Sequence, residues 1–187
     1  FYDYARKQIE LAPNITWVQD EVVHIRENSY ADIQGTFGSY RASHIFDSRI
    51  PAAFDDKGDS YTRLLQHFRG WYVQTDVDVF DSSKFLMMDF RLQWKDTTSF
   101  TYVLPTSPRT ALVEFTLFTP MLIGHDDYDK MLRQYMIEVL KIEAYVINEV
   151  ETGVIPMSDY PFYKHHTNSI TKIGTAGGWV KPSSGYS

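Results

Sequence analysis

The sequence Ile170-Thr171-Lys172-Ile173-Gly174-Thr175-Ala176-Gly177-Gly178 joins an apolar strand pattern directly to a cluster of glycines. Pro182 and Gly185 follow shortly after it. Glycines at this density predict a backbone that takes positive φ angles, or one that another group approaches more closely than a Cβ would allow. A flexible linker or a frayed terminus is the alternative interpretation of such a segment. The strand that leads into the glycines favours an ordered, ligand-binding turn.

This segment resembles the second flavin-contacting motif of flavoproteins similar to the aromatic hydroxylases, in which Gly-Asp-Ala-Ala-His is followed by Pro-x-x-Gly. The matching positions are Gly174, Ala176, Pro182 and Gly185. Thr175 stands in place of the motif's Asp, and Gly178 in place of its His. With these two departures, and with the Lys-Pro-Ser-Ser-Gly-Tyr that follows, the segment is similar to the flavin-dependent lycopene β-cyclases of the bacterial type, which form rings in carotenoids.

Further blocks match the same family in the same order along the chain. They are residues 66–71 (Gln-His-Phe-Arg-Gly-Trp), 86–91 (Leu-Met-Met-Asp-Phe-Arg), 100–116 and 151–157 (Glu-Thr-Gly-Val-Ile-Pro-Met). The resemblance therefore covers nearly the whole chain.

The resemblance implies an α/β (α+β) fold of the FAD-binding flavoprotein superfamily. Residues 1–50 would form part of the FAD-binding domain, residues 51–158 an antiparallel substrate-binding sheet with an amphipathic helix, and residues 159–187 a return to the FAD-binding domain. The sequence contains no Gly-x-Gly-x-x-Gly, the turn that would hold a dinucleotide pyrophosphate. We therefore expect the chain to be an internal fragment of a longer protein.

Local patterns predict the elements of this fold. A helix over residues 4–12 is expected to stop at Pro13, and apolar residues from Tyr128 to Ile142 recur at helical spacing after a cap in His125-Asp126-Asp127. Strands are expected where β-branched and aromatic residues are bounded by turn residues. These stretches are residues 15–18, 21–26, 30–33, 39–46, 64–75, 84–94, 98–104, 110–118 and 170–173.

The resemblance implies reduced FAD as cofactor, with NAD(P)H as its reductant. The expected flavin-contacting residues are Asp47, Gly174, Thr175, Ala176, Gly177, Gly178, Pro182, Gly185 and Tyr186. Asp47 ends a strand pattern in Ile-Phe-Asp-Ser-Arg, which resembles the element where this superfamily leaves its nucleotide domain. A plain turn acid or cap is the alternative for Asp47.

Cyclisation of a polyene begins when a double bond is protonated, so the chemistry calls for a carboxylic acid among apolar neighbours. Burial raises the pKa of such an acid and lets it donate a proton at neutral pH. Glu114, between Val113 and Phe115, matches the family's essential glutamate, although Phe115 replaces the second acid of that motif. A solvent-facing strand position is the alternative for Glu114. The further catalytic candidates are Asp89, for which a protective edge-strand charge is the alternative, and Glu151.

Aromatic side chains on neighbouring strands are expected to stabilise a carbocation through their π-faces, or simply to fill the core of the sheet. The substrate-binding candidates are Trp71, Phe90 and Tyr102. The expected substrate is lycopene or a related polyene. Because such a substrate resides in membranes, we expect a cytoplasmic protein attached peripherally to the membrane surface.

Composition limits the other possibilities. The chain has 187 residues, of which 43% are hydrophobic, and a formal net charge of −6, which favours a well-packed core and argues against a nucleic-acid partner. It has no cysteine, and its His165-His166 pair lacks a carboxylate at ligand spacing, so no metal site is expected. Two other functions stay open: a redox flavoprotein, such as a polyprenyl reductase or an aromatic hydroxylase, and a degenerate relative that only binds a lipid.

Overall fold

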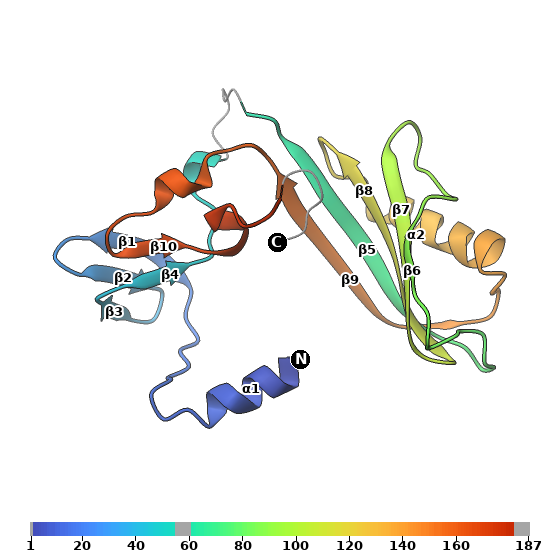
Figure 1. Ribbon diagram of the computed structural model, residues 1–187, viewed down its shortest axis with the longest axis horizontal. Coiled ribbons are helices and arrows are strands. Elements are labelled where there is room, and N and C mark those ends of the chain that lie inside the picture. Colours follow the sequence, from blue (N-terminus) through green and yellow to red (C-terminus); the bar gives the residue numbers. More distant parts are fainter. Residues whose placement is uncertain (1, 55–60, 182–187) are drawn as a thin grey trace.

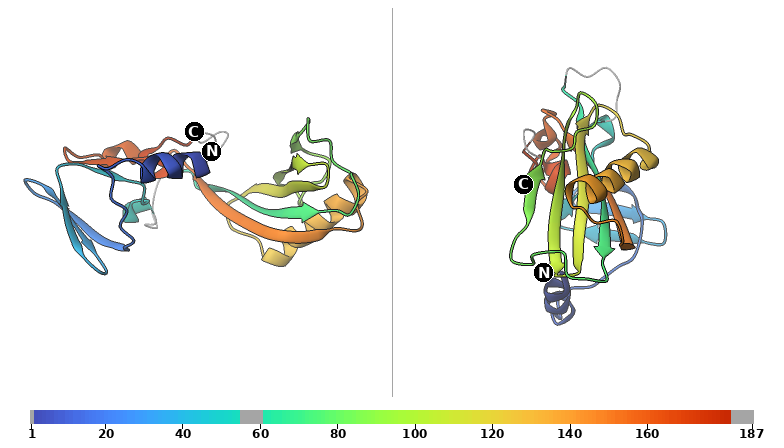
Figure 2. Two further views of the ribbon diagram at one scale, coloured as in Figure 1. Left: turned by 90° about the horizontal axis from the view of Figure 1, so that it is seen from below. Right: turned by 90° about the vertical axis from the view of Figure 1, so that its right-hand side faces the viewer.

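The computed structural model describes residues 2–54 and 61–181, and it shows a mixed α/β chain in two parts (Figure 1). The larger part is a five-stranded antiparallel sheet with helix α2 along one of its sides, as the turned views in Figure 2 show. The smaller part holds a three-stranded antiparallel sheet and a two-stranded parallel pair. Helix α1 (Tyr2–Glu10) precedes them and buries none of its residues.

The five-stranded sheet has the strand order β6-β7-β8-β5-β9. Its strands are β5 (Leu64–Gln74), β6 (Leu86–Asp89), β7 (Thr98–Ser107), β8 (Thr110–Thr119) and β9 (Val146–Met157). The strands expected over residues 64–75, 98–104 and 110–118 are confirmed. The strand expected over residues 84–94 is wrong beyond Asp89, because Met88 has a φ of 54° and the Asp89 side chain accepts a hydrogen bond from the backbone N–H of Arg91, which turns the chain.

Strand β9 has 12 residues and was not predicted as a strand, because Gly153 and Pro156 resemble strand breakers. Both residues fit their places in the sheet. β9 is an edge strand, where a proline need not donate to a neighbour. A Cβ at Gly153 would lie only 2.2 Å from Cζ of Phe68 on β5, so the glycine makes room for that ring.

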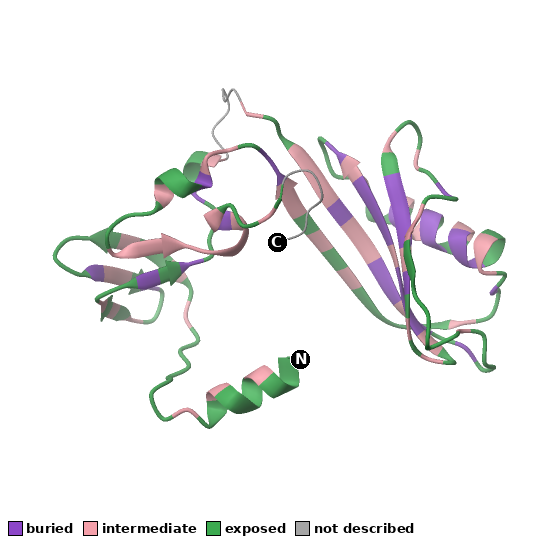
Figure 3. Ribbon diagram, in the orientation of Figure 1, coloured by how far each residue is buried: buried purple, intermediate pink, exposed green. Residues whose placement is uncertain are grey.

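One face of the sheet and helix α2 (His125–Gln134) enclose the core (Figure 3). The expected helical face is confirmed, and the helix continues as a π-helical turn, Tyr135–Val139. The N-cap residue is Gly124, which makes no side-chain capping bond, so the expected cap by His125-Asp126-Asp127 is wrong. Full burial of each large apolar side chain contributes roughly 1.5–3 kcal/mol. These core side chains include Trp71, Val73, Val103, Val113, Phe115, Leu117, Tyr128, Met131, Leu132, Tyr135 and Met136.

The smaller part pairs a strand from the first third of the chain with a strand near its C-terminal end. Its strands are β1 (Val22–Glu27), β2 (Ala31–Gly35), β3 (Ser39–Ala42), β4 (Ile45–Asp47) and β10 (Ile170–Lys172), with short helical turns η1 (Ala52–Phe54), η3 (Phe162–His165) and η4 (Gly174–Gly177). β4 and β10 pair in parallel, with Asp47 opposite Lys172. The single strand expected over residues 39–46 is wrong because the chain breaks into β3 and β4, and residues 15–18 form no strand. Within residues 2–54 and 61–181, no helix combines the length and apolar character needed to cross a membrane.

Candidate active site

Two of the predicted catalytic acids lie side by side on the sheet face opposite helix α2. Glu114 on β8 and Glu151 on β9 both stand directly opposite Gly70, which lies on β5 between them. Residues in register across neighbouring strands point to the same face of a sheet. The two glutamates are 37 positions apart in the sequence (151 − 114), and the sheet brings their side chains into one row.

Gly70 makes this row possible. A Cβ added at Gly70 would lie 3.1 Å from Cγ of Glu151, 3.3 Å from Cβ of Glu114 and 2.9 Å from Cδ1 of Leu112. All three distances are at or below the closest ordinary contacts. The absent side chain therefore leaves the gap through which the two glutamates reach each other over the middle strand.

The pair is set up to hold a proton near neutral pH. Burial raises the pKa of Glu114 to about 7, and the hydrogen bond with Glu151 and its negative charge act in the same direction. Thr116 Oγ1 donates a 3.0 Å hydrogen bond to Glu114 Oε1, which opposes the rise. The Tyr72 hydroxyl donates to Glu151 Oε2 at 3.4 Å. The arrangement resembles other carboxylate pairs in which like charges at short range keep one acid protonated.

Thr116 was missed from the sequence, and Tyr72 was considered only as one of the aromatic rings of the sheet and not as a hydrogen-bond donor to an acid. Both belong to the same face as the acids, because they lie two residues from Gly70 and Glu114 on their respective strands. Alternation along the strands is a signal that could have found them once the register was known.

Aromatic rings continue the same face toward the edge of the sheet. Tyr102 on β7 stands directly opposite Glu114. The Tyr102 ring packs edge-on against Phe100 at 5.0 Å between centroids, and Phe90 packs edge-on against Phe100 at 5.7 Å. Phe118 also contacts Phe100, at 6.0 Å. The predicted substrate-binding residues Phe90 and Tyr102 therefore share one aromatic cluster that borders the acid pair.

Trp71, the third predicted substrate-binding residue, lies on the other face. Its side chain is 2% exposed within the core, and its Nε1 donates to Asp129 Oδ1 at 3.1 Å. Asp129 also pairs with Arg69 at 2.6 Å. This position corresponds to the core-filling alternative that the sequence left open for the aromatic residues.

Asp89 is also separated from the acid pair, because its register partner Thr101 belongs to the helix-facing side of the sheet. It forms an ion pair with Arg91, and the Tyr135 hydroxyl donates to Asp89 Oδ2 at 2.5 Å. The hydrogen bond from Arg91 and that from Tyr135 outweigh the effect of burial and lower the pKa of Asp89 to about 2. An ionised, anchored carboxylate is a poor proton donor, so this geometry does not support the predicted catalytic role of Asp89.

Asp47, the predicted cofactor contact, is buried at the end of β4. Arg49 Nε donates to its Oδ1 at 2.9 Å and Lys172 Nζ to its Oδ2 at 2.7 Å. Burial alone would raise the pKa of Asp47, but these two hydrogen bonds outweigh it and lower the pKa to about 2. In this structure the carboxylate ties β4 to β10.

The glycine segment has the backbone that its composition predicts. Gly174 and Gly178 have φ angles of +59° and +75°, and a Cβ at Gly177 would lie 2.4 Å from the carbonyl oxygen of Lys172. Ala176 is fully buried and Thr175 is partly exposed. The further predicted flavin contacts Pro182, Gly185 and Tyr186 lie outside the described residues.

A hollow of about 350 Å³ adjoins this segment. Thr175, Gly177 and Gly178 form part of its wall, and Tyr160 and Phe162 contribute aromatic rings. Among residues 2–54 and 61–181, and apart from the chain neighbours of Gly174, no atom lies within 4 Å of the position that a Cβ would take there, so these residues leave its backbone uncovered. These features suit a planar ligand laid against the chain.

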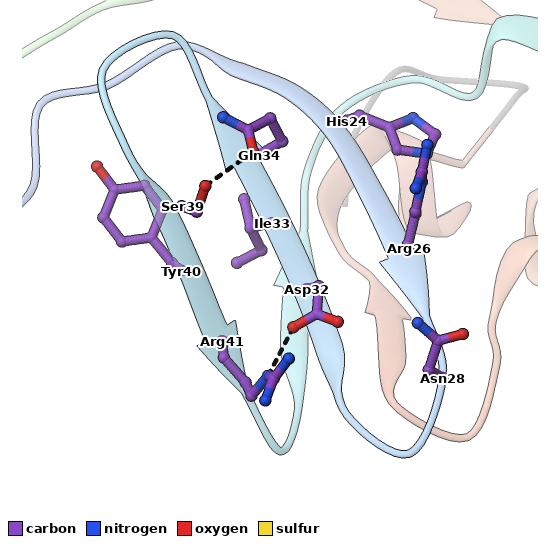
Figure 4. Close-up of a pocket in the computed structure, with 9 residues that line it drawn as sticks. All are labelled: His24, Arg26, Asn28, Asp32, Ile33, Gln34, Ser39, Tyr40 and Arg41. Carbon is purple, nitrogen blue, oxygen red and sulfur yellow. Dashed lines mark hydrogen bonds and ion pairs between the residues drawn. The ribbon is translucent and has the colours of Figure 1, made fainter.

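A larger hollow, of about 630 Å³, lies on the three-stranded sheet and not at the acid pair. Figure 4 shows its polar lining, in which Arg41 Nε donates to Asp32 Oδ1 at 2.7 Å and Ser39 donates to Gln34 at 2.8 Å. None of the predicted site residues lines it. We place the candidate active site at the acid pair, because the predicted acids Glu114 and Glu151 meet there.

The fold is shared with proteins of known structure. The geranylgeranyl bacteriochlorophyll reductase-like protein from Thermoplasma acidophilum superposes with a TM-score of 0.63 at 13% identity, over 90% of this chain and 44% of that protein. Peptidyl tryptophan dihydroxylase QhpG superposes with a TM-score of 0.50 at 13% identity, over 87% of this chain and 37% of that protein. The chain thus spans less than half the length of either. The chain therefore shares its mixed α/β fold with part of each of these two proteins.

The sequence comparison goes further than the fold. Residues 13–187 match the family model described as lycopene cyclase protein, and the chain belongs to that family. A comparison with curated protein sequences found no match.

Proposed function

We propose that this chain carries the acid site of a lycopene β-cyclase, which closes the linear ends of lycopene or a related polyene into β-rings. The observation that carries the proposal is the acid pair on the sheet face opposite α2, where Glu114 has a pKa of about 7. An acid with this pKa is present in both protonation states at neutral pH, which suits general acid catalysis. Membership of the lycopene cyclase family supports the substrate class.

In the proposed reaction, Glu114 donates its proton to a terminal carbon–carbon double bond. The carbocation that results is captured by a neighbouring double bond, which closes the ring, and a different proton then leaves. Substrate and product are isomers, and no electrons are transferred overall. The rings of Tyr102, Phe100 and Phe90 border the acid pair, where they are placed to stabilise a passing cation and to exclude water.

The glycine segment fits the flavin that the family resemblance implies. The flavin ring system would be held by the backbone at Gly174 and by Thr175, Gly177 and Gly178, which line the hollow. Reduced FAD, kept reduced by NAD(P)H, would supply electrostatic assistance without net redox change. Peripheral attachment to the cytoplasmic side of a membrane is part of the same proposal, since the substrate is a membrane hydrocarbon.

The first test is Glu114→Gln, expressed as the whole protein in cells that accumulate lycopene. Glutamine keeps the size and hydrogen bonding of the side chain but has no acidic proton. We expect ring formation to fall by at least ~10²-fold, the lower limit for a positioned general acid. Pigment analysis provides the measurement. Asp89→Asn, on the opposite face of the sheet, is the comparison. Near-normal cyclisation by Glu114→Gln would contradict the proposal.

An isotope experiment separates the cyclase from the redox flavoproteins that share the fold. In deuterium oxide each new ring should gain one deuterium, while hydride labelled on the nicotinamide should not enter the product. Transfer of that label to the pigment, or consumption of one NAD(P)H per product, would establish a reductase or hydroxylase instead.

A further inference from the structure

The structure shows two carboxylates where the proposed reaction needs two proton transfers. One proton must enter the polyene and a different one must leave. In the family motif a second acid follows the essential glutamate, whereas this chain has Phe115, which is fully buried on the helix-facing side. Glu151 supplies a second carboxylate from a different strand, next to Glu114.

We propose that Glu114 and Glu151 form one proton-sharing pair, built across Gly70, in which Glu114 donates the entering proton and Glu151 accepts the leaving one. This inference rests on the proposed function and adds to it the base and the positioning residue. The protons balance over one ring closure. Glu114 loses a proton to the double bond, and Glu151 gains the proton that the cation releases. A transfer along the hydrogen bond between them, and exchange of the pair's proton with solvent before the next ring forms, restore the starting state.

The two glutamates have different surroundings, which suit Glu114 to donate a proton and Glu151 to accept one. Glu114 is the more enclosed acid, with Leu112 and Tyr102 beside it, and this burial favours its neutral form although Thr116 donates a hydrogen bond to it. Glu151 lies on the edge strand and accepts a hydrogen bond from the Tyr72 hydroxyl, which suits the role of proton acceptor.

The other charged or titratable groups near the pair are few in the part of the chain that the structure describes. Burial and the charges of Glu151, Glu149 and Glu114 raise the pKa of Tyr72, which therefore stays protonated as a donor at neutral pH. Glu149 is exposed and stands opposite Tyr72 on β9. Arg69 belongs to the helix-facing side, where it is paired with Asp129. Among the described residues, burial, Thr116 and Glu151 determine the pKa of Glu114, and no cation takes part.

Gly70 is a positioning residue because it acts through the two acids and carries no reactive group. An alanine there would place a methyl group 3.1 Å from Glu151 and 3.3 Å from Glu114, so both side chains must give by a few tenths of an ångström. The tightest contact, 2.9 Å to Leu112, is with the end of a flexible side chain. We expect Gly70→Ala to fold and to loosen the pair.

The test is a titration of the whole protein without substrate, by infrared spectroscopy of the carboxylic C=O band that Glu114→Gln removes. In the wild type this band should disappear as the pH rises through about 7. In Glu151→Gln, and to a smaller extent in Gly70→Ala, it should disappear about one pH unit lower, the scale on which coupled sites influence each other. Glu149→Gln is the matched control, because it removes one negative charge from the same strand, and it should leave the titration in place.

A second readout follows the leaving proton. If Glu151 is the base, Glu151→Gln should still protonate the polyene, but the cation should lose protons from other carbons and give a mixture of ring double-bond isomers.

The outcomes separate this inference from the proposed function. An unchanged C=O titration in both Glu151→Gln and Gly70→Ala would overturn the proton-sharing pair, even if the protein cyclises lycopene. The expected shifts in a protein that forms no rings would support the pair and refute the cyclase. Should Gly70→Ala fail to fold, Gly70→Ala/Leu112→Ala relieves the tightest contact and keeps the other two, and it must then show the same downward shift.

Discussion

Replacing Glu114 with glutamine has a consequence for folding that is independent of any chemistry. The pKa of Glu114 is 4.5 in its ordinary state and about 7 in the folded protein. Between these values the folded state binds more protons than the unfolded state, so this side chain makes the protein less stable as the pH rises. At 1.36 kcal/mol per pKa unit, the difference corresponds to at most ~3 kcal/mol above pH 7. Burying a carboxylate that must ionise there is the physical cause.

Glu114→Gln removes the titration and therefore the penalty. We compare the free energy of unfolding of the variant with that of the wild type. This difference should shift in favour of the variant by about 2 kcal/mol between pH 5 and pH 8. Urea unfolding at the two pH values measures this, and the fluorescence of the buried Trp71 reports it close to the site. Glu149→Gln, which removes an exposed charge on the same sheet, should show no such pH-dependent gain. A stability difference between wild type and Glu114→Gln that is the same at both pH values would refute the raised pKa and with it the argument for the acid.

Two further predictions concern the framework. Asp47→Asn should lower the free energy of unfolding by ~2 kcal/mol at pH 7, because it leaves the largely buried Lys172 without its carboxylate partner. In the wild type the stabilisation by the Asp47 carboxylate is fully present above pH 3.8 and is lost as the pH falls through about 2. Unfolding midpoints measured across this acid range test the prediction. Leu132→Ala removes a fully buried side chain between α2 and the sheet and should lower the free energy of unfolding by ~2–5 kcal/mol, measured with denaturant. Ile137→Ala changes a residue that is 49% exposed and should lower it far less. Equal effects of the two substitutions would contradict the core described above.

Local sequence patterns were sufficient for the strands and helix whose signals lie within one segment. β5, β7, β8 and the apolar face of α2 follow from β-branched, aromatic and helical spacing alone. β9 was missed because the meaning of Gly153 and Pro156 depends on their place in the sheet: the glycine faces a ring of the neighbouring strand, and the proline is tolerated at an edge.

The candidate site shows the same division. Glu114 could be selected from its apolar neighbours and the family motif, and Glu151 from its motif. Their contact depends on the register of three strands, which a single sequence does not specify. Asp89 also lies among apolar residues in the sequence, but a turn places it on the other face of the sheet, where it pairs with Arg91 and Tyr135. Apolar neighbours in the sequence therefore do not by themselves identify a proton donor.

The separation of the two sheet faces bears on how proteins of this architecture diversify. Every second residue of β5 and β8 packs against α2, whereas the opposite face of the sheet carries Glu114 on β8, Glu151 on β9 and the bordering aromatic ring of Tyr102 on β7. Substitutions on the opposite face change a reactive surface while the packing that maintains the fold stays intact. A lineage can therefore exchange one chemistry for another at little cost in foldability, provided that the replacements keep to alternate positions. Gly70 is the exception to this freedom, because any side chain there alters the spacing of its neighbours on both adjoining strands.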